Sequence, residues 1–251
     1  MTTRVALSRT AGGLWSVPVT LAGGTGPRQF VIDTGSERTV VAADVAEALG
    51  LSLRPGPVLY TPAGRIDASE ATIGPLGLGG LHVPSLAVIV ADLRDVGRGW
   101  PLDGILGMDV LGGRDLLIDF ARERLTIGGE LRATGDTRLA ARTVGGRRVV
   151  AARVDGRPRD LVLDTGAASF VIFESAGAGE RVRLGAAGGS VEARMRRAEV
   201  AVGGVHLGGV PVVRLPAIAP RAGNDGLLPG NVFSRIFIDA GGDEVRVVPR
   251  R

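Results

Sequence analysis

The sequence predicts an all-β protein made of two similar units, and three observations lead to this prediction. Short segments rich in Val, Ile and Leu recur along the chain, turn-forming residues separate them, and one order of motifs occurs twice. The chain has 40 Gly and 14 Pro among 251 residues, which fits short strands joined by tight turns. An apolar content of 45% is sufficient for packed cores.

Each expected element follows from its local pattern. A helix is expected over Ala42–Leu49, where acidic residues lie among alanines and Gly50 follows as a stop, and a shorter helix begins near Met108. Between residues 128 and 143, glycines and scattered charges interrupt the β pattern, so we expect the linker between the two units there. The segments with the clearest strand pattern are 16–21, 30–32, 87–90, 161–163 and 211–213.

The two units are marked by a repeated triplet. Asp33-Thr34-Gly35 follows the apolar run 30–32, and Asp164-Thr165-Gly166 follows the apolar run 161–163, with an offset of 164 − 33 = 131. The blocks that come after each triplet occur in the same order: 63–68 and 188–193, 78–83 and 202–207, 103–106 and 225–228, and 118–119 and 238–239. Two long units of this kind predict an internal duplication with paired lobes at 1–130 and 131–251, rather than a solenoid of many short repeats.

The triplets also predict a chemistry. An apolar run that ends in an acid and a glycine is typical of a buried strand that delivers a carboxylate onto a tight turn. Two such turns, one per unit, can bring two carboxylates together, and such a pair can share one proton and activate one water molecule. A single Asp-Thr-Gly would be an ordinary turn signal.

Charge and residue counts exclude several other classes of function. All 30 basic residues are arginine, but the net charge is only +4 and aromatic residues make up 4% of the chain, so we expect a solvated arginine-rich surface and no nucleic-acid binding. The chain has no cysteine, and no lysine for a phosphate-binding P-loop. His82 and His206 occupy equivalent places with no further ligand nearby in sequence, so no metal is expected. Ser36 and Ser169 lack the setting of a hydrolase nucleophile.

The apolar stretches and the N-terminus bear on where the protein is located. No apolar stretch is long enough to cross a bilayer as a helix, and the N-terminus has no apolar core of signal-peptide length. If Met1 is the native start, a cytoplasmic protein is expected; if a leader was removed, the protein is periplasmic or secreted.

With its doubled Asp-Thr-Gly, each followed later by Asp-Gly and two aliphatic residues, the chain resembles pepsin-superfamily aspartic proteases. The segments 30–36 and 103–109 are most similar to bacterial retropepsin-like members, and the resemblance extends over roughly residues 15–248. It implies a bilobal acid-protease fold of two pseudo-twofold-related, β-barrel-like lobes with short helices. It also implies an endopeptidase that needs no cofactor, acts on peptide or protein substrates and is complete as a monomer.

The resemblance assigns roles to the repeated residues. Asp33 and Asp164 would form the catalytic dyad, and the amides of Gly35 and Gly166 would donate to their carboxylates. Thr34 and Thr165 would reach across to the opposite turn and lock the two loops together. Ser36 would add a hydrogen bond to Asp33 and lower its pKa relative to that of Asp164, whereas Ala167 stands at the equivalent place in the second unit. Asp103 and Asp225 are expected to be structural turn residues.

In this family a β-hairpin flap covers the substrate. Tyr60, Thr61, Ala63 and Gly64 lie where the first flap is expected, and Tyr60, the only tyrosine, would close over the substrate. The corresponding segment around Gly188 and Gly189 is rich in glycine and lacks an aromatic residue, so we expect a mobile or vestigial second flap. Whether one or two flaps close stays open.

One departure from the family pattern favours an alternative. Where the family has aliphatic, aliphatic, glycine under each catalytic turn, the second unit has Leu227-Leu228-Pro229-Gly230. Proline removes a backbone donor and fixes φ. If this loosens the support of Asp164, the chain would be a catalytically weak or inactive peptide-binding or scaffold protein that retains the fold. If Gly230 takes over the role one residue later, nothing is lost.

Overall fold

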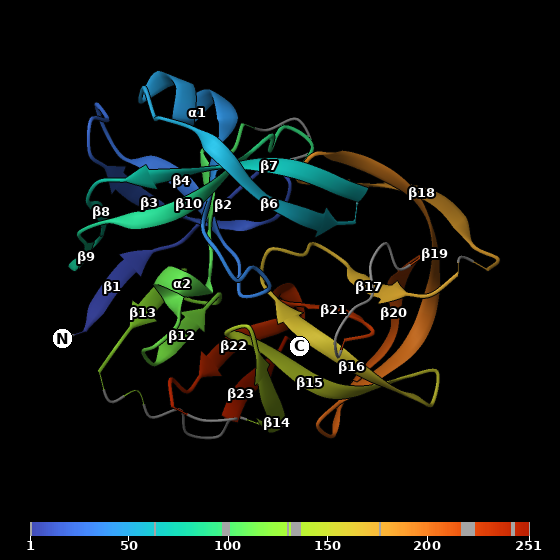
Figure 1. The fold of residues 1–251 in the computed structure, drawn as a ribbon. Helices are drawn as coiled ribbons and strands as arrows, with labels where there is room; N and C mark the ends of the chain where they lie inside the picture. The colour runs from blue at the N-terminus through green and yellow to red at the C-terminus, as the bar shows by residue number, and fades with distance from the viewer. Residues whose placement is uncertain are drawn as a thin grey trace.

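A computed structural model describes residues 2–62, 64–96, 101–129, 131, 137–175, 177–216, 224–241 and 244–250. Strands dominate these residues, so the predicted all-β class is confirmed (Figure 1). They form one sheet of ten strands and one of thirteen. None of the helices in the described ranges is long and apolar enough to cross a membrane.

The ten-stranded sheet is built entirely from residues 8–106. Its order is β6-β7-β10-β5-β11-β4-β3-β8-β9, and β2 pairs with β3. Its strands are β2 (Ser8–Arg9), β3 (Trp15–Leu21), β4 (Arg28–Ile32), β5 (Val40–Ala42), β6 (Arg54–Thr61), β7 (Gly64–Ile73), β8 (Leu76–Leu78), β9 (Leu81–Val83), β10 (Leu86–Ala91) and β11 (Gly104–Leu106).

The thirteen-stranded sheet joins the two predicted units. Its order is β1-β13-β12-β22-β23-β14-β15-β16-β21-β17-β20-β19-β18, and β15 also pairs with β19. Its strands are β1 (Thr3–Ala6), β12 (Leu116–Asp119), β13 (Arg124–Ile127), β14 (Thr137–Val144), β15 (Arg147–Val154), β16 (Arg157–Asp164), β17 (Phe170–Phe173), β18 (Glu180–Ala186), β19 (Gly189–Val202), β20 (Val205–Leu215), β21 (Gly226–Pro229), β22 (Phe233–Ile238) and β23 (Glu244–Pro249).

The helices lie where the sequence predicts them. Helix α1 (Ala43–Ala48) ends just before Gly50, whose φ of +62° suits a glycine stop, and α2 (Met108–Leu111) begins at the expected residue. A short 3₁₀ helix, η1 (Gly230–Val232), occupies the matching place in the second unit.

The expected linker is too long. Strand β14 begins at Thr137 and continues to Val144, so the segment 137–143 is not part of a linker. Its residues 137–140 pair with β23 and its residues 141–144 pair with β15, and these backbone hydrogen bonds outweigh the glycines and charges that suggested a break. The boundary between lobes 1–130 and 131–251 stays a prediction.

One large cluster of buried apolar side chains runs through both sheets, and a smaller separate cluster in the second unit consists of Val171, Ala193, Val213 and Leu215. The two predicted units meet directly where β12 pairs antiparallel with β22, from Leu116 opposite Ile238 to Asp119 opposite Arg235. Continuous pairing of this kind holds the end of one unit against the other by backbone hydrogen bonds as well as by apolar packing.

Candidate active site

Buried strands deliver the two aspartates to the site. Asp33 follows β4, which lies parallel to β11, and its amide donates to the Leu106 carbonyl at 3.0 Å. Asp164 is the last residue of β16, which lies parallel to β21 with Asp164 opposite Pro229. Each carboxyl group therefore stands at the end of a strand that is fixed by a parallel neighbour.

Hydrogen bonds cross between the two turns. The Thr34 hydroxyl donates to the Leu163 carbonyl, and the Thr165 hydroxyl donates to the Ile32 carbonyl, both at 2.7 Å. The Thr34 amide donates to Thr165 Oγ1 at 3.1 Å, and the Thr165 amide donates to Thr34 Oγ1 at 3.2 Å. Because both threonines are buried, at 1% and 4% exposure, water does not compete for these bonds. These hydrogen bonds fix the two turns rigidly against each other.

The glycines let the carboxyl groups come close. A methyl group at Gly35 would lie 2.5 Å from Cγ of Asp164, and one at Gly166 would lie 2.5 Å from Cγ of Asp33. The Gly35 amide donates to Asp33 Oδ1 at 2.8 Å. Each carboxyl group thus occupies the space that a side chain on the opposite turn would take.

Electrostatics favour one shared proton. Burial raises the pKa of Asp33, while hydrogen bonds from the Gly35 amide, the Asp164 side chain and the Ser36 amide, together with the charge of Arg147, act to lower it. Burial raises the pKa of Asp164 well above its ordinary value, and the charge of Asp33 and the hydrogen bond between the two carboxyl groups raise it further. The pKa of Asp164 is thus raised more than that of Asp33, so electrostatics favour Asp164 as the member that holds the shared proton.

The role expected for the Ser36 hydroxyl is wrong. Ser36 Oγ donates to the Arg38 carbonyl at 2.8 Å, a local turn contact two residues along the chain, instead of to Asp33. Its backbone amide is the group that favours the charged form of Asp33. In the second unit the amides of Ala167 and Gly166 favour the charged form of Asp164. The missing hydroxyl of Ala167 therefore removes nothing that the first unit uses at its carboxylate.

The structure accommodates Pro229 without strain. Pro229 has φ −69°, and its counterpart Gly107 has φ −92°, so neither position needs the freedom of glycine. The Gly107 amide donates to Thr39 Oγ1 at 3.2 Å, whereas the residue equivalent to Thr39, at the same 131-residue offset as the aspartates, is the buried Phe170. A donor and its acceptor are both replaced by apolar groups, which leaves no buried polar atom unpaired.

One further pair of equivalent residues, Asp109 and Asn231, supports the turns. Asp109 accepts hydrogen bonds from the Thr39 amide and hydroxyl at 2.8 and 2.6 Å. Its counterpart Asn231 donates through Nδ2 to the Ala168 carbonyl at 3.0 Å. Residue 109 in one unit and residue 231 in the other therefore tie the loop after each aspartate to the short helix behind it.

Asp103 and Asp225 make structural contacts, and the two contacts are equivalent. Asp103 Oδ2 accepts from the Gln29 amide at 2.7 Å, and Asp225 Oδ2 accepts from the Asp160 amide at 2.9 Å. Gln29 and Asp160 each lie four residues before an aspartate of the pair. These carboxylates fix the strands that carry Asp33 and Asp164.

The hairpins β6–β7 and β18–β19 approach each other at their tips (Figure 1). Thr61 Oγ1 donates to the Ala187 carbonyl at 3.0 Å, and a methyl group at Gly188 would lie 2.4 Å from Cγ2 of Ile66. Gly64 and Gly189 open the return strands, whereas Ala63 lies outside the described residues.

The second hairpin is not vestigial. β18 pairs with β19 through seven residue pairs, from Glu180 opposite Met195 to Ala186 opposite Gly189. Its glycine-rich tip suggested weak structure, but long-range strand pairing and the contact with the first hairpin hold it. The Tyr60 side chain is 56% exposed, so its closure over a substrate stays a prediction.

Sequence reasoning missed Arg147. This residue begins β15, forms an ion pair with Glu37 at 2.6 Å and places a positive charge that lowers the pKa of Asp33. Glu37 lies four residues after Asp33, so the ion pair joins the turn of Asp33 to the second unit. Arg147 follows Gly145-Gly146, and because the chain contains many arginines and glycines, its sequence context did not indicate this contact.

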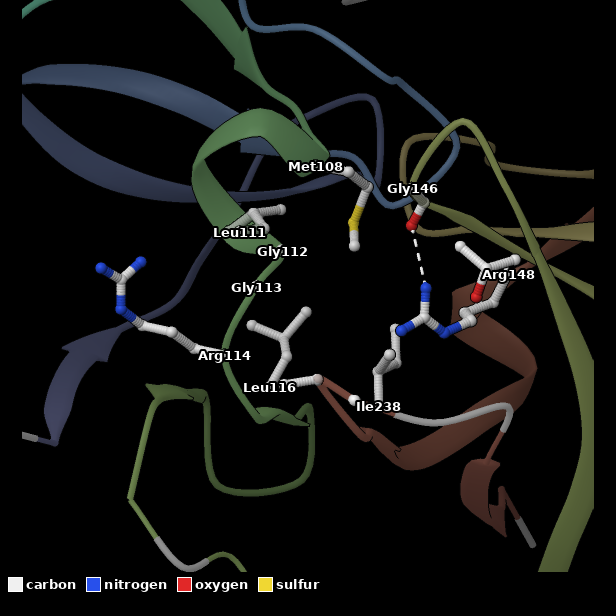
Figure 2. Close-up of a pocket in the computed structure, with 12 residues that line it drawn as sticks. Met108, Leu111, Gly112, Gly113, Arg114, Leu116, Gly146, Arg148 and Ile238 are labelled. Atoms are coloured by element: carbon white, nitrogen blue, oxygen red, sulfur yellow. Dashed lines mark hydrogen bonds between the residues drawn. The ribbon is translucent and has the colours of Figure 1, made fainter.

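Neither Asp33 nor Asp164 lines either of the two cavities. Figure 2 shows one between α2 and the segment 146–148, where Arg148 Nη1 donates to the Gly146 carbonyl at 3.1 Å; its volume is about 220 Å³. Its apolar wall includes Met108, Leu111 and Ile238. The other, of about 710 Å³, lies beside the β18–β19 hairpin. Among the described residues, no three His, Asp or Glu side chains gather as a metal site.

Comparison with known proteins agrees with this geometry. Residues 17–110 match the family model described as aspartyl protease, a segment that includes Asp33 and the β6–β7 hairpin. The resemblance to aspartic proteases is thereby confirmed for this part of the chain. The search of curated proteins returned no match.

Proposed function

We propose that this chain is an aspartic endopeptidase that hydrolyses peptide bonds with a water molecule activated by Asp33 and Asp164. The observation that carries the proposal is the pair of carboxyl groups on two turns locked by crossing threonine hydrogen bonds. The family match over residues 17–110 supports a hydrolase of this type.

The proposed reaction uses the unequal protonation of the pair. Ionised Asp33 accepts a proton from water, and that water attacks the carbonyl carbon of the scissile bond. Protonated Asp164 donates to the carbonyl oxygen, where negative charge develops. Asp164 Oδ1 is buried and has no hydrogen-bond partner among the described residues. The step needs neither a metal nor a covalent intermediate.

The substrate is proposed to be an extended peptide held below the two hairpin tips. Hairpins that meet at Thr61 and Ala187 have to separate for a chain to enter and can close again over it. Because one chain supplies both aspartates, we propose that a monomer is sufficient. The equivalent contacts of Asp103 and Asp225 support an origin by internal duplication.

The competing proposal is a peptide-binding protein without catalysis, and observations on the second turn speak against both of its grounds. It depended on Pro229 and Ala167, and the φ of Pro229 and the backbone amides at Ala167 leave the support of Asp164 intact. The competing proposal still makes one distinct prediction: the protein binds peptides but does not cleave them at any pH.

The test is to measure hydrolysis of a fluorogenic peptide library by Asp33→Asn and Asp164→Asn. Loss of general acid-base action typically costs about 10²–10⁴-fold in rate, and a loss of this size is expected for each variant. Asp160→Asn is the matched control, because the Asp160 side chain is 49% exposed and pairs with Arg142 at the surface. Undiminished turnover in either dyad variant, or binding without turnover by the parent, would refute the proposal.

A further inference from the structure

The cavity of about 710 Å³ lies beside the β18–β19 hairpin of the second unit, and both apolar and polar side chains line it. Its wall includes Val182, Leu184, Met195 and Val213, and Ser169 lies at its edge. Ser169 comes five residues after Asp164, so the segment that follows this aspartate borders the cavity. The loop of the first unit reaches it through Asp95.

The sheet register identifies the equivalent place in the first unit. Val213 lies beside Val171, seven residues after Asp164, and opposite Met195. The position of Met195 is therefore defined by strand pairing and not by sequence similarity.

In the first unit, the same comparison of strand register leads to the acidic residue Glu70. Ile89 lies beside Val40, seven residues after Asp33, and opposite Glu70. Glu70 is thus the counterpart of Met195. By the same offset that relates the aspartates, Arg38 is the counterpart of Ser169.

In the first unit, Arg38 and Glu70 occupy the place that is equivalent to Ser169 and Met195 in the second unit. Arg38 Nη2 pairs with Glu70 Oε1 at 2.5 Å and donates to the Ala87 carbonyl at 3.1 Å, so the guanidinium group lies across the sheet. Arg54 donates to Glu70 Oε2 through Nε at 3.1 Å and Nη2 at 2.8 Å. The Glu70 side chain is only 18% exposed. The Arg38 guanidinium group, 36% exposed, therefore has two acceptors, and its ion pair with Glu70 covers this place.

The second place stays open because its residues cannot fill it in the same way. Ser169 is too short to cross the sheet, and Met195 offers a thioether where Glu70 offers a carboxylate. One wall comes from the opposite unit: a methyl group at Gly185 would lie 1.8 Å from the Asp95 carbonyl oxygen, so glycine is required for this contact. The result is a cavity between the hairpin and a loop of the other unit, with an apolar wall of Val182, Leu184, Met195 and Val213 and with Ser169, Arg183 and Ser190 as further lining residues.

We propose that the cleft is asymmetric, with an open subsite at Ser169 and Met195 that takes one large apolar side chain of the peptide, and a mirrored place closed by Arg38 and Glu70. This inference rests on the proposed function, since it assigns the cavity to the same peptide. It predicts that size is selected strongly on one side of the scissile bond and weakly on the other.

The experiment uses four statine-type peptides that carry Leu or Ala on either side of the statine, titrated into the protein by calorimetry. The parent is expected to prefer Leu over Ala by about tenfold at one side only, as apolar pockets discriminate side chains of different size. Ser169→Arg should reduce this preference to within about twofold. His206→Arg is the matched control, because it adds the same group at an exposed position on β20.

The reciprocal variant guards against misfolding of the first. Arg38→Ser combined with Glu70→Met should create a preference for Leu at the second side. Equal preferences on both sides in the parent, no preference at either side, no binding of any of the four peptides, or no effect of Ser169→Arg in a folded protein would each overturn the asymmetric cleft.

Turnover is measured separately with matching cleavable peptides. Selective binding without turnover would refute the endopeptidase and keep the subsite. Turnover with no one-sided selection would keep the endopeptidase and refute the subsite.

Discussion

The absence of a side chain at Gly35 and Gly166 sets how close the two aspartates come. Gly35→Ala and Gly166→Ala would each place a methyl group 2.5 Å from Cγ of the opposite carboxyl group, which must then move. A displacement of about 1 Å at reacting groups can cost about 10²-fold in rate, and we expect a loss of that order in kcat for each variant. Gly26→Ala is the control, because nothing lies within 4 Å of its Cβ position. Activity equal to that of Gly26→Ala would contradict the close approach.

Pro229 tests whether the second turn needs a glycine. Pro229→Gly would restore a backbone donor opposite the apolar Phe170 and would release the chain entropy that proline removes. We expect turnover to stay within about twofold, since the φ of −69° is ordinary for this turn, and the free energy of unfolding to fall by about 0.4–1 kcal/mol. Urea unfolding and peptide hydrolysis measure the two effects. A large gain in activity would instead show that proline impairs Asp164.

At the scale of elements, the hairpin tips make the contact most relevant to substrate entry. Gly188 has φ +81°, and a methyl group there would meet Ile66 at 2.4 Å. Gly188→Ala should separate the tips and raise KM for peptides severalfold. Gly208→Ala is the matched control: Gly208 has φ +69° with nothing within 4 Å, so it carries the backbone strain of about 1–2 kcal/mol without the clash. Equal KM values for the two variants would argue against a role of the tip contact.

The sequence predicted the elements whose signals are local. Apolar runs before Asp33 and Asp164 gave the strands, and Gly50 marked the end of α1, because period, composition and turn residues act over a few positions. The same local view wrongly extended the linker into β14, where pairing with β23 decides the conformation.

Contacts between distant segments could not be predicted in this way. The different roles of Glu70 and Met195 become apparent only once strand register aligns the two units. The approach of Arg147 to Asp33 depends on how the start of β15 sits against the first catalytic turn. The Ser36 hydroxyl donates to the nearby Arg38 carbonyl and not to Asp33. A short polar side chain has several hydrogen-bond acceptors within reach, and the sequence does not show which of them it will use.

At the scale of the whole molecule, the two units are joined at three levels around the site. Strands β12 and β22 pair at the base, the turns of Asp33 and Asp164 exchange hydrogen bonds through Thr34 and Thr165, and the hairpin tips meet at Thr61 and Ala187. The separation of the carboxyl groups is therefore a property of the assembled molecule, and any global loosening should reach the site.

The dyad also makes the stability of the whole molecule depend on pH. The folded pKa values of Asp33 and Asp164 are raised, mainly by burial, so the folded state binds protons more tightly than the unfolded state. The stability that this supplies is fully present below the unfolded pKa of about 3.9 and is lost as pH rises through the folded values. Buried carboxylates of this kind destabilise the fold at neutral pH.

Asp164→Asn should therefore be more stable than the parent at pH 7, and the difference should shrink as the pH falls towards 3. Each kcal/mol moves the Tm of a protein of this size by about 2–4 °C, so the gain is measurable by calorimetry across a pH series. Glu70 and Asp92 act in the opposite sense, since Arg38 lowers the pKa of Glu70 and Arg94 lowers that of Asp92 to about 2. Their contributions are lost at acid pH in both proteins and cancel in the difference. A variant less stable than the parent at pH 7 would mean that Asp164 holds the turns together more strongly than its burial opposes them.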